Sequence, residues 1–139
     1  MSLKENLLNI QDRINSAIYR SGETRAVELV AVTKTHPFKI IEESFQLGIQ
    51  SVGENRVQEA TQKFKSFKNM PGLKRRFIGH LQMNKVNKCL SLFDTVDSID
   101  SLRLAKKIDN QSKNLNKKTT TLLEAVSYTH LTLPTILLV

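Results

Sequence analysis

Three polar residues, Lys34, Asn55 and His80, stand where short apolar runs of the sequence end. Lys34 directly follows the run Leu29–Thr33, and the other two follow the next two runs along the chain. In parallel α/β folds the loops at the carboxyl ends of the strands converge, and helix N-termini point toward a ligand there. We therefore expect these three side chains to share one pocket above a sheet.

Lys34 has the clearest chemistry of the three. A lysine at the edge of a buried strand is desolvated, which favours the neutral amine that attacks a carbonyl group. This is the chemistry of a Schiff base. Taken alone, Lys34 also fits a lysine whose ammonium group reaches solvent along the strand end. His80 and Asn55 likewise fit either a ligand site or an ordinary surface loop.

The pattern of apolar residues predicts helices and strands that alternate. A capping box of Ser2 and Glu5 begins a first amphipathic helix, which ends at Ser21. Alternation of this kind predicts the α/β class with a parallel sheet, either doubly wound or the first part of a barrel. The predicted strands are Glu28–Thr33, Gln50–Val52, Arg76–Gly79, Asp94–Val96 and Thr119–Leu123, and the helices that follow them start at Pro37, Glu54, Asn84 and Ser98.

Composition limits the class of protein. The chain has 139 residues, of which 40% are apolar and 24% charged, and this predicts one globular domain. No apolar run reaches the roughly 18 residues of a membrane span, and the N-terminus lacks the pattern of a secretory signal, so we expect a cytoplasmic protein. The single cysteine, Cys89, is expected to be a buried apolar residue.

The formal charge of +8 raises the question of nucleic acid as a partner. Six basic residues and no acid lie between Lys63 and Arg76. Runs of this kind usually form a solvated face, and no known nucleic-acid-binding motif accompanies this one. We expect no nucleic-acid partner, and an RNA-binding module remains the weaker rival.

Residues 125–139 differ abruptly in composition from the rest of the chain. They read AVSYTHLTLPTILLV and include no Lys, Arg, Asp or Glu. A buried strand or an apolar disordered end would be ordinary interpretations. A translated sequencing adaptor fits better, because one adaptor frame would encode VSYTHL at Val126–Leu131. We therefore predict a native domain over residues 1–124 and a non-native tail over 125–139.

Four segments together resemble a known family, the small pyridoxal-phosphate homeostasis proteins of the YggS and PROSC type, often described as alanine-racemase-like. The segments occur in the family's order and spacing, and the resemblance covers essentially all of residues 1 to about 125. They are LVAVTKTHP (Leu29–Pro37), VGENRVQEA (Val52–Ala60), FIGHLQMNK (Phe77–Lys85) and TVDSIDSLRLAKKI (Thr95–Ile108).

The resemblance implies a TIM-like (β/α) barrel of the fold-type III pyridoxal-phosphate class, of which this chain would be the N-terminal part. It implies pyridoxal 5′-phosphate as the cofactor, held by Lys34 as an internal aldimine, with Asn55 and His80 as pocket neighbours and no metal. It also implies a protein without an established catalytic reaction, normally one domain and often monomeric, that buffers the cofactor or delivers it to pyridoxal-phosphate-dependent apo-enzymes.

This chain departs from the family pattern at several positions. Thr33 and Val52 replace a common Ser and Phe, and Arg75-Arg76 replaces Trp-His. The Ser-and-Gly-rich loop and the late Arg-x-Gly segment that grip the cofactor phosphate do not occur, which predicts weaker binding. The alternative interpretation is a fragment of a fold-type III enzyme, an amino-acid racemase or decarboxylase, in which Lys34 is also the base.

Overall fold

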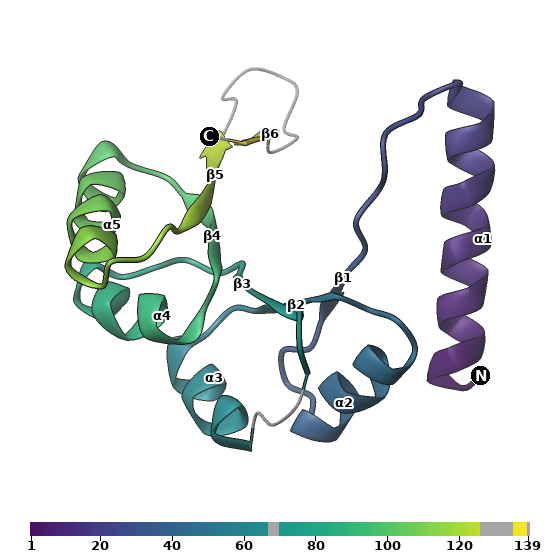
Figure 1. Ribbon diagram of the computed structural model, residues 1–139, viewed down its shortest axis with the longest axis horizontal. Coiled ribbons are helices and arrows are strands. Elements are labelled where there is room, and N and C mark those ends of the chain that lie inside the picture. The colour runs from purple at the N-terminus through teal and green to yellow at the C-terminus, as the bar shows by residue number, and fades with distance from the viewer. Residues whose placement is uncertain (67–69, 126–134, 139) are drawn as a thin grey trace.

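The computed structural model describes residues 1–66, 70–125 and 135–138, which form helices that alternate with strands (Figure 1). The strands are β1 (Val30–Val32), β2 (Ser51–Glu54), β3 (Lys74–Phe77), β4 (Thr95–Ile99), β5 (Thr120–Ala125) and β6 (Thr135–Leu138). The helices are α1 (Leu3–Ser21), α2 (Phe38–Gln46), α3 (Val57–Lys63), α4 (Val86–Leu92) and α5 (Leu102–Asn114), with short 3₁₀ turns at Phe64–Ser66 and Met83–Lys85.

Strands β1 to β5 form a parallel sheet in the order of the sequence, and β6 pairs antiparallel with β5. A doubly wound sheet reverses its strand order at a switch point, whereas a (β/α) barrel keeps sequential order. Figure 1 shows the strands in a curved row, with α2 to α5 along its outer side. The predicted α/β class is thus confirmed, and the arrangement is that of part of a barrel.

The hydrophobic core lies between the outer face of the sheet and helices α2 to α5. Phe93 stands at its centre, with its ring edge-to-face against Phe64 at 5.5 Å and against Phe77 at 5.2 Å between centroids. Aromatic pairs in this geometry contribute about 0.5–1.5 kcal/mol beyond the area they bury. Fully buried neighbours of these rings in the same core are Val52, Ala60, Val86, Cys89, Leu90 and Val96.

Cys89 provides a chemical test of this core. Its side chain is fully buried on α4, and burial raises the pKa of the thiol to about 12. Because the thiolate is the reactive form, we expect the folded chain to react with a disulfide reagent at pH 8 about 100-fold or more slowly than the urea-unfolded chain. Absorbance of the released thiol would measure both rates, and equal rates would contradict the packing of α4.

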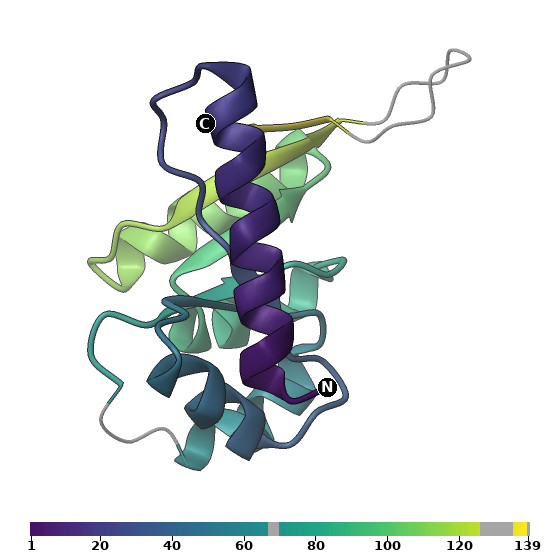
Figure 2. The same ribbon diagram turned by 90° about the vertical axis from the view of Figure 1, so that its right-hand side faces the viewer.

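Helix α1 begins and ends as the sequence predicts. The Glu5 amide donates to Ser2 Oγ at 3.2 Å, the Ser2 amide donates to Glu5 Oε2 at 2.7 Å, and Gly22 closes the helix at φ 68°. Figure 2 shows α1 running lengthwise beside the sheet. Within the described chain no residue of α1 is fully buried, and Leu7 and Ile10 line an apolar groove of about 480 Å³ that β1 and α2 complete.

Two predicted helix starts are wrong, because polar residues there belong to strands. Glu54 is the last residue of β2 and is fully buried. Its Oε1 can be buried there because it accepts from Thr33 and from Lys63 of α3. Ser98 lies within β4, where its hydroxyl donates to the Gly79 carbonyl at 2.5 Å. The corresponding helices begin later, at Val57 and Leu102.

None of the helices within residues 1–66, 70–125 and 135–138 combines the length with the hydropathy that a membrane span requires. Over the same ranges, no group of three or more His, Cys, Asp or Glu side chains is arranged to hold a metal ion.

Candidate functional site

The loops that carry Lys34, Asn55 and His80 leave the sheet at one edge. Strands β1, β2 and β3 are parallel neighbours, with Val32 paired to Gly53 in the register. Each of the three polar residues follows the end of its strand by at most three positions. The structure thus places the three loops at the edge where the sequence predicted a shared pocket.

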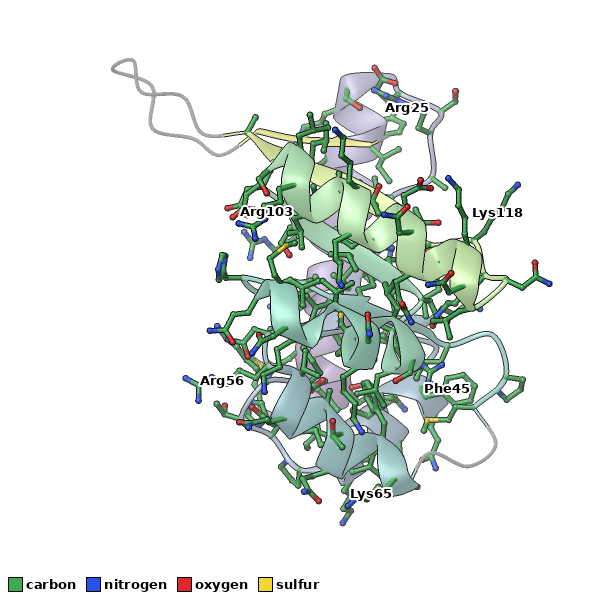
Figure 3. The ribbon with its side chains drawn as sticks, turned by 90° about the vertical axis from the view of Figure 1, so that its left-hand side faces the viewer. Arg25, Phe45, Arg56, Lys65, Arg103 and Lys118 are labelled. Atoms are coloured by element: carbon green, nitrogen blue, oxygen red, sulfur yellow. The ribbon has the colours of Figure 1, made fainter. Side chains whose placement is uncertain are left out.

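Asn55 and His80 line one open cavity of about 430 Å³ at this edge. His80 is largely exposed, and its Nδ1 lies 3.4 Å from Asp100 Oδ2. Lys34 does not line this cavity, so the structure brings together two of the three predicted residues. The other side chains around the cavity are Arg56, Val57, Gln58, Phe77, Leu81, Gln82 and Lys85; Arg56 points away from the ribbon in Figure 3.

Lys34 is exposed, and the prediction that it is desolvated at the edge of a buried strand is wrong. The reason lies in β1, which has a single neighbour among the described strands. Alternation turns Ala31 and Thr33 toward the helices and Val32 toward the open concave face, where it is 49% exposed. Across the described ranges, Lys34 Nζ has no hydrogen-bond or ion-pair partner, so its amine is free.

The turn that follows β1 has an unusual backbone. Thr35 adopts a φ of 65°, a left-handed conformation that is rare for a β-branched residue and costs about 1–3 kcal/mol. Its amide donates to Glu59 Oε1 of α3 at 2.6 Å, and the His36 amide donates to the Thr33 carbonyl at 3.1 Å. Contacts from another element therefore hold this turn.

Lys63, at the end of α3, ties the same turn to the sheet. Its Nζ lies 2.7 Å from the Thr33 carbonyl oxygen, 2.8 Å from Glu54 Oε1 and 2.9 Å from Glu59 Oε1. Thr33 Oγ1 also donates to Glu54 Oε1 at 2.6 Å. Lys63 and Glu54 are 10% and 0% exposed, so this ion pair is shielded from water and from salt.

Sequence reasoning missed Glu54, Glu59 and Lys63 as one group. The spacing of Glu59 and Lys63, four residues apart on a helix, is a signal for an ion pair, but it does not reveal that the pair faces the sheet. The contact of Lys63 with Thr33 spans 30 residues and depends on how α3 packs. Tertiary structure alone brings these charges to the Lys34 turn.

Glu59 should make this turn sensitive to acid. The hydrogen bond from Lys63, then that from the Thr35 amide, lowers the pKa of Glu59 below its ordinary 4.5, and the charge of Arg56 adds a smaller effect. A lowered folded-state pKa gives stability that is complete above the ordinary pKa and is lost as pH falls through the folded value. We expect Glu59→Gln to cost about 1 kcal/mol of unfolding free energy at pH 6–7 and progressively less below pH 4.5.

Urea unfolding of both chains from pH 7 to pH 3 would measure this difference. A cost that stays constant down to pH 3 would contradict the role assigned to the Glu59 carboxylate.

The basic segment 63–76 is only partly the solvated face that the sequence predicted. Lys63 is enclosed by its carboxylates, and Arg76 on β3 is 12% exposed and pairs with Asp97 on β4. Arg76 Nε lies 2.7 Å from Asp97 Oδ2, and Nη2 donates to Oδ1 at 3.3 Å. Lys65 is exposed as predicted, whereas Lys68 lies outside the described residues. Neighbouring acids from other elements therefore neutralise part of this charge.

The chain is similar to individual proteins of known sequence, although no family model matches it. Over 127 residues, 89% of this chain, it is 35% identical to a pyridoxal phosphate homeostasis protein of Pasteurella multocida, of which it covers 54%. It is 37% identical to the protein of that name from Escherichia coli K12 over 112 residues, 78% of this chain and 48% of the relative. The chain thus spans about half the length of the curated relatives it matches.

Solved structures agree with this similarity. PipY of Synechococcus elongatus without PLP superimposes with a TM-score of 0.76 at 32% identity, over 91% of this chain and 54% of PipY. PipY with PLP bound gives a TM-score of 0.65 at 38% identity, over 74% of this chain and 50% of that one. An unknown protein from Bifidobacterium adolescentis gives 0.82 at 29% identity, over 93% and 57% of the two chains.

Sequence and fold agree over nearly the whole described chain, and the strands whose ends carry Lys34, Asn55 and His80 belong to the matched region. The chain is therefore a homologue of the pyridoxal phosphate homeostasis proteins and spans about half of their length.

Proposed function

We propose that this chain binds pyridoxal 5′-phosphate through a Schiff base on Lys34 and takes part in pyridoxal-phosphate homeostasis. The observation that carries the proposal is the free amine of Lys34 at the strand edge where the three loops begin. The relatives support it by name, and one structure of the similar PipY has PLP bound. Because the chain spans about half the length of these relatives, the proposal concerns only the Lys34 side of a cofactor site.

The residues present fit such a cofactor. Lys34, exposed and without a hydrogen-bond partner in the described part of the chain, would hold an aldehyde cofactor through its amine after giving up a proton to solvent, with one water released. Asn55 can donate and accept hydrogen bonds at the neighbouring cavity, and His80 lies on its rim. Arg56 and Lys85 add positive charge to the cavity lining, which suits an anionic group such as a phosphate.

The role we propose is binding and supply of the cofactor inside the cell, without a catalytic reaction of its own. The relatives are named for homeostasis and not for a reaction. Pyridoxal-phosphate-dependent apo-enzymes are the recipients we propose, and the whole protein is proposed to act as a monomer in the cytoplasm.

Mapping the covalent site tests the proposal. The purified chain would be mixed with pyridoxal phosphate, reduced with borohydride and digested for mass spectrometry. We expect the phosphopyridoxyl group chiefly on Lys34, although the chain has 13 other lysines that the reagent can reach if they are equally reactive. Uniform labelling of exposed lysines would contradict the proposal.

We also propose that residues 125–139 are not native, as their composition predicts. The pairing of β6 supports this, because it is antiparallel whereas every other strand pair described in the sheet is parallel. Residues 126–134 and 139 lie outside the described residues. The nucleotide sequence of codons 126–131 is the test, and any sequence other than the adaptor would contradict the idea.

A further inference from the structure

The residues on either side of Lys34 are both anchored to α3. Before it, the Thr33 carbonyl accepts from Lys63 Nζ at 2.7 Å; after it, the Thr35 amide donates to Glu59 Oε1 at 2.6 Å. Lys34 itself has an unpartnered amine over the described residues. Its backbone is thus held from both sides while its side chain stays available.

The ammonium group of Lys63 has an acceptor for each of its three N–H donors. A lysine ammonium has three donors, and the Thr33 carbonyl, Glu54 and Glu59 place three acceptor oxygens within 2.9 Å of Nζ. Two carboxylates face one cation whose side chain is only 10% exposed, so the cation is held strongly in place. Lys63 can therefore fix Thr33 and orient Glu59 at the same time.

If these charged residues served only to join α3 to the sheet, they would need no contact with the turn that follows β1. The ion pair of Lys63 with Glu54 alone would meet that purpose, because Glu54 is the last residue of β2 and also accepts from Thr33, the residue that follows β1. Glu59 reaches further and binds the amide of Thr35, the residue with the left-handed backbone. This contact acts on the turn that determines where the Lys34 side chain starts.

We infer that Lys63, Glu59 and Glu54 form a clamp that presets the Lys34 turn for attachment of the cofactor aldehyde. They are positioning residues, and the inference rests on the function proposed above for Lys34. The clamp acts by limiting the turn to one conformation, so that less conformational freedom is lost when the amine meets its carbonyl partner.

A matched pair of Glu59 variants tests the clamp. Glu59→Gln keeps an oxygen that accepts from the Thr35 amide, and Glu59→Met removes it at similar length. Because Glu59 is 27% exposed at its side chain, both chains should stay folded, which circular dichroism would check. Lys65→Met is the control: this lysine is exposed, bonds to Gln62 at 3.3 Å on the surface, and points away from the molecule in Figure 3.

Two quantities would be measured: amide hydrogen exchange at Thr35 by NMR, and the rate of borohydride-trapped labelling of Lys34 by pyridoxal phosphate. We expect Glu59→Met to speed Thr35 exchange and to slow Lys34 labelling, each by about tenfold or more, as loss of a hydrogen bond to a charged group implies. Glu59→Gln should restore most of both values, and Lys65→Met should change neither.

Lys63→Met should give the same two changes to a greater degree; if that chain fails to fold, the Glu59 pair decides. Unchanged Thr35 exchange in Glu59→Met, or faster exchange with unchanged Lys34 labelling, would overturn the clamp while the function stands. Failure of the unaltered chain to label at Lys34 would instead overturn the proposed function, and Thr35 exchange alone would then judge whether the clamp holds the turn.

Discussion

Replacing Lys34 by methionine should reduce borohydride-trapped pyridoxal phosphate on residues 29–37 to background. Methionine keeps the length of the side chain and removes the amine, so no C=N bond can form at this position. Intact mass after reduction would give the stoichiometry, and peptide mapping the position. Within this segment the loss should be complete, because Lys34 is the only lysine of residues 29–37.

Lys39→Met is the matched control. Lys39 lies on α2, is 78% exposed at its side chain and makes a long ion pair of 3.7 Å with Glu43. It should label slowly before the change, and its loss should leave the main adduct intact. An adduct of equal amount in the Lys34 and Lys39 variants would show that attachment is random and would refute the assignment of Lys34.

The second large effect concerns Gly79, which brings two of the candidate loops together. A Cβ at position 79 would overlap the carbonyl oxygen of Asn55 and lie 2.8 Å from the carbonyl carbon and Cα of the same residue. These are backbone atoms, so no side-chain rotation can relieve the overlap. Gly79→Ala should therefore lower the free energy of unfolding by about 3 kcal/mol and displace the Asn55 loop.

Urea unfolding would measure the loss, with Gly72→Ala as the control. Gly72 has a φ of 78° and open space around its Cβ position, so alanine there meets only backbone strain of about 1–2 kcal/mol. A cost at Gly79 no larger than that at Gly72 would contradict the close packing of the two loops.

Much of the fold was predictable because local signals agreed with one another. The capping box at Ser2 and the apolar run before Lys34 act within a few residues of chain. Alternation of strands and helices then predicted parallel pairing. The helix starts predicted at Glu54 and Ser98 were wrong. A polar residue after an apolar run favours a helix start, and the sequence does not reveal the buried partner that keeps it in a strand.

The choice between a doubly wound sheet and a barrel could not come from spacing. Both use the same alternating units, and they differ in which strand each new unit joins. The resemblance of the four motifs favoured the barrel, and the sequential order β1 to β5 agrees with it. Strand order is a long-range property, because it depends on contacts between residues far apart in the chain.

The sequence alone determined that Lys34, Asn55 and His80 would lie at one edge of a parallel sheet, since alternation with helices makes the strands parallel and nearby residues mark where each strand ends. Tertiary structure decided the environment of these residues. Lys34 is exposed because its strand has one described neighbour, the turn around it is held by Glu59 and Lys63 from a helix about 25 residues away, and Asn55 meets His80 at a cavity that Lys34 does not line. Burial and charge pairing depend on what packs beside a residue, and that is determined only when the whole chain has folded.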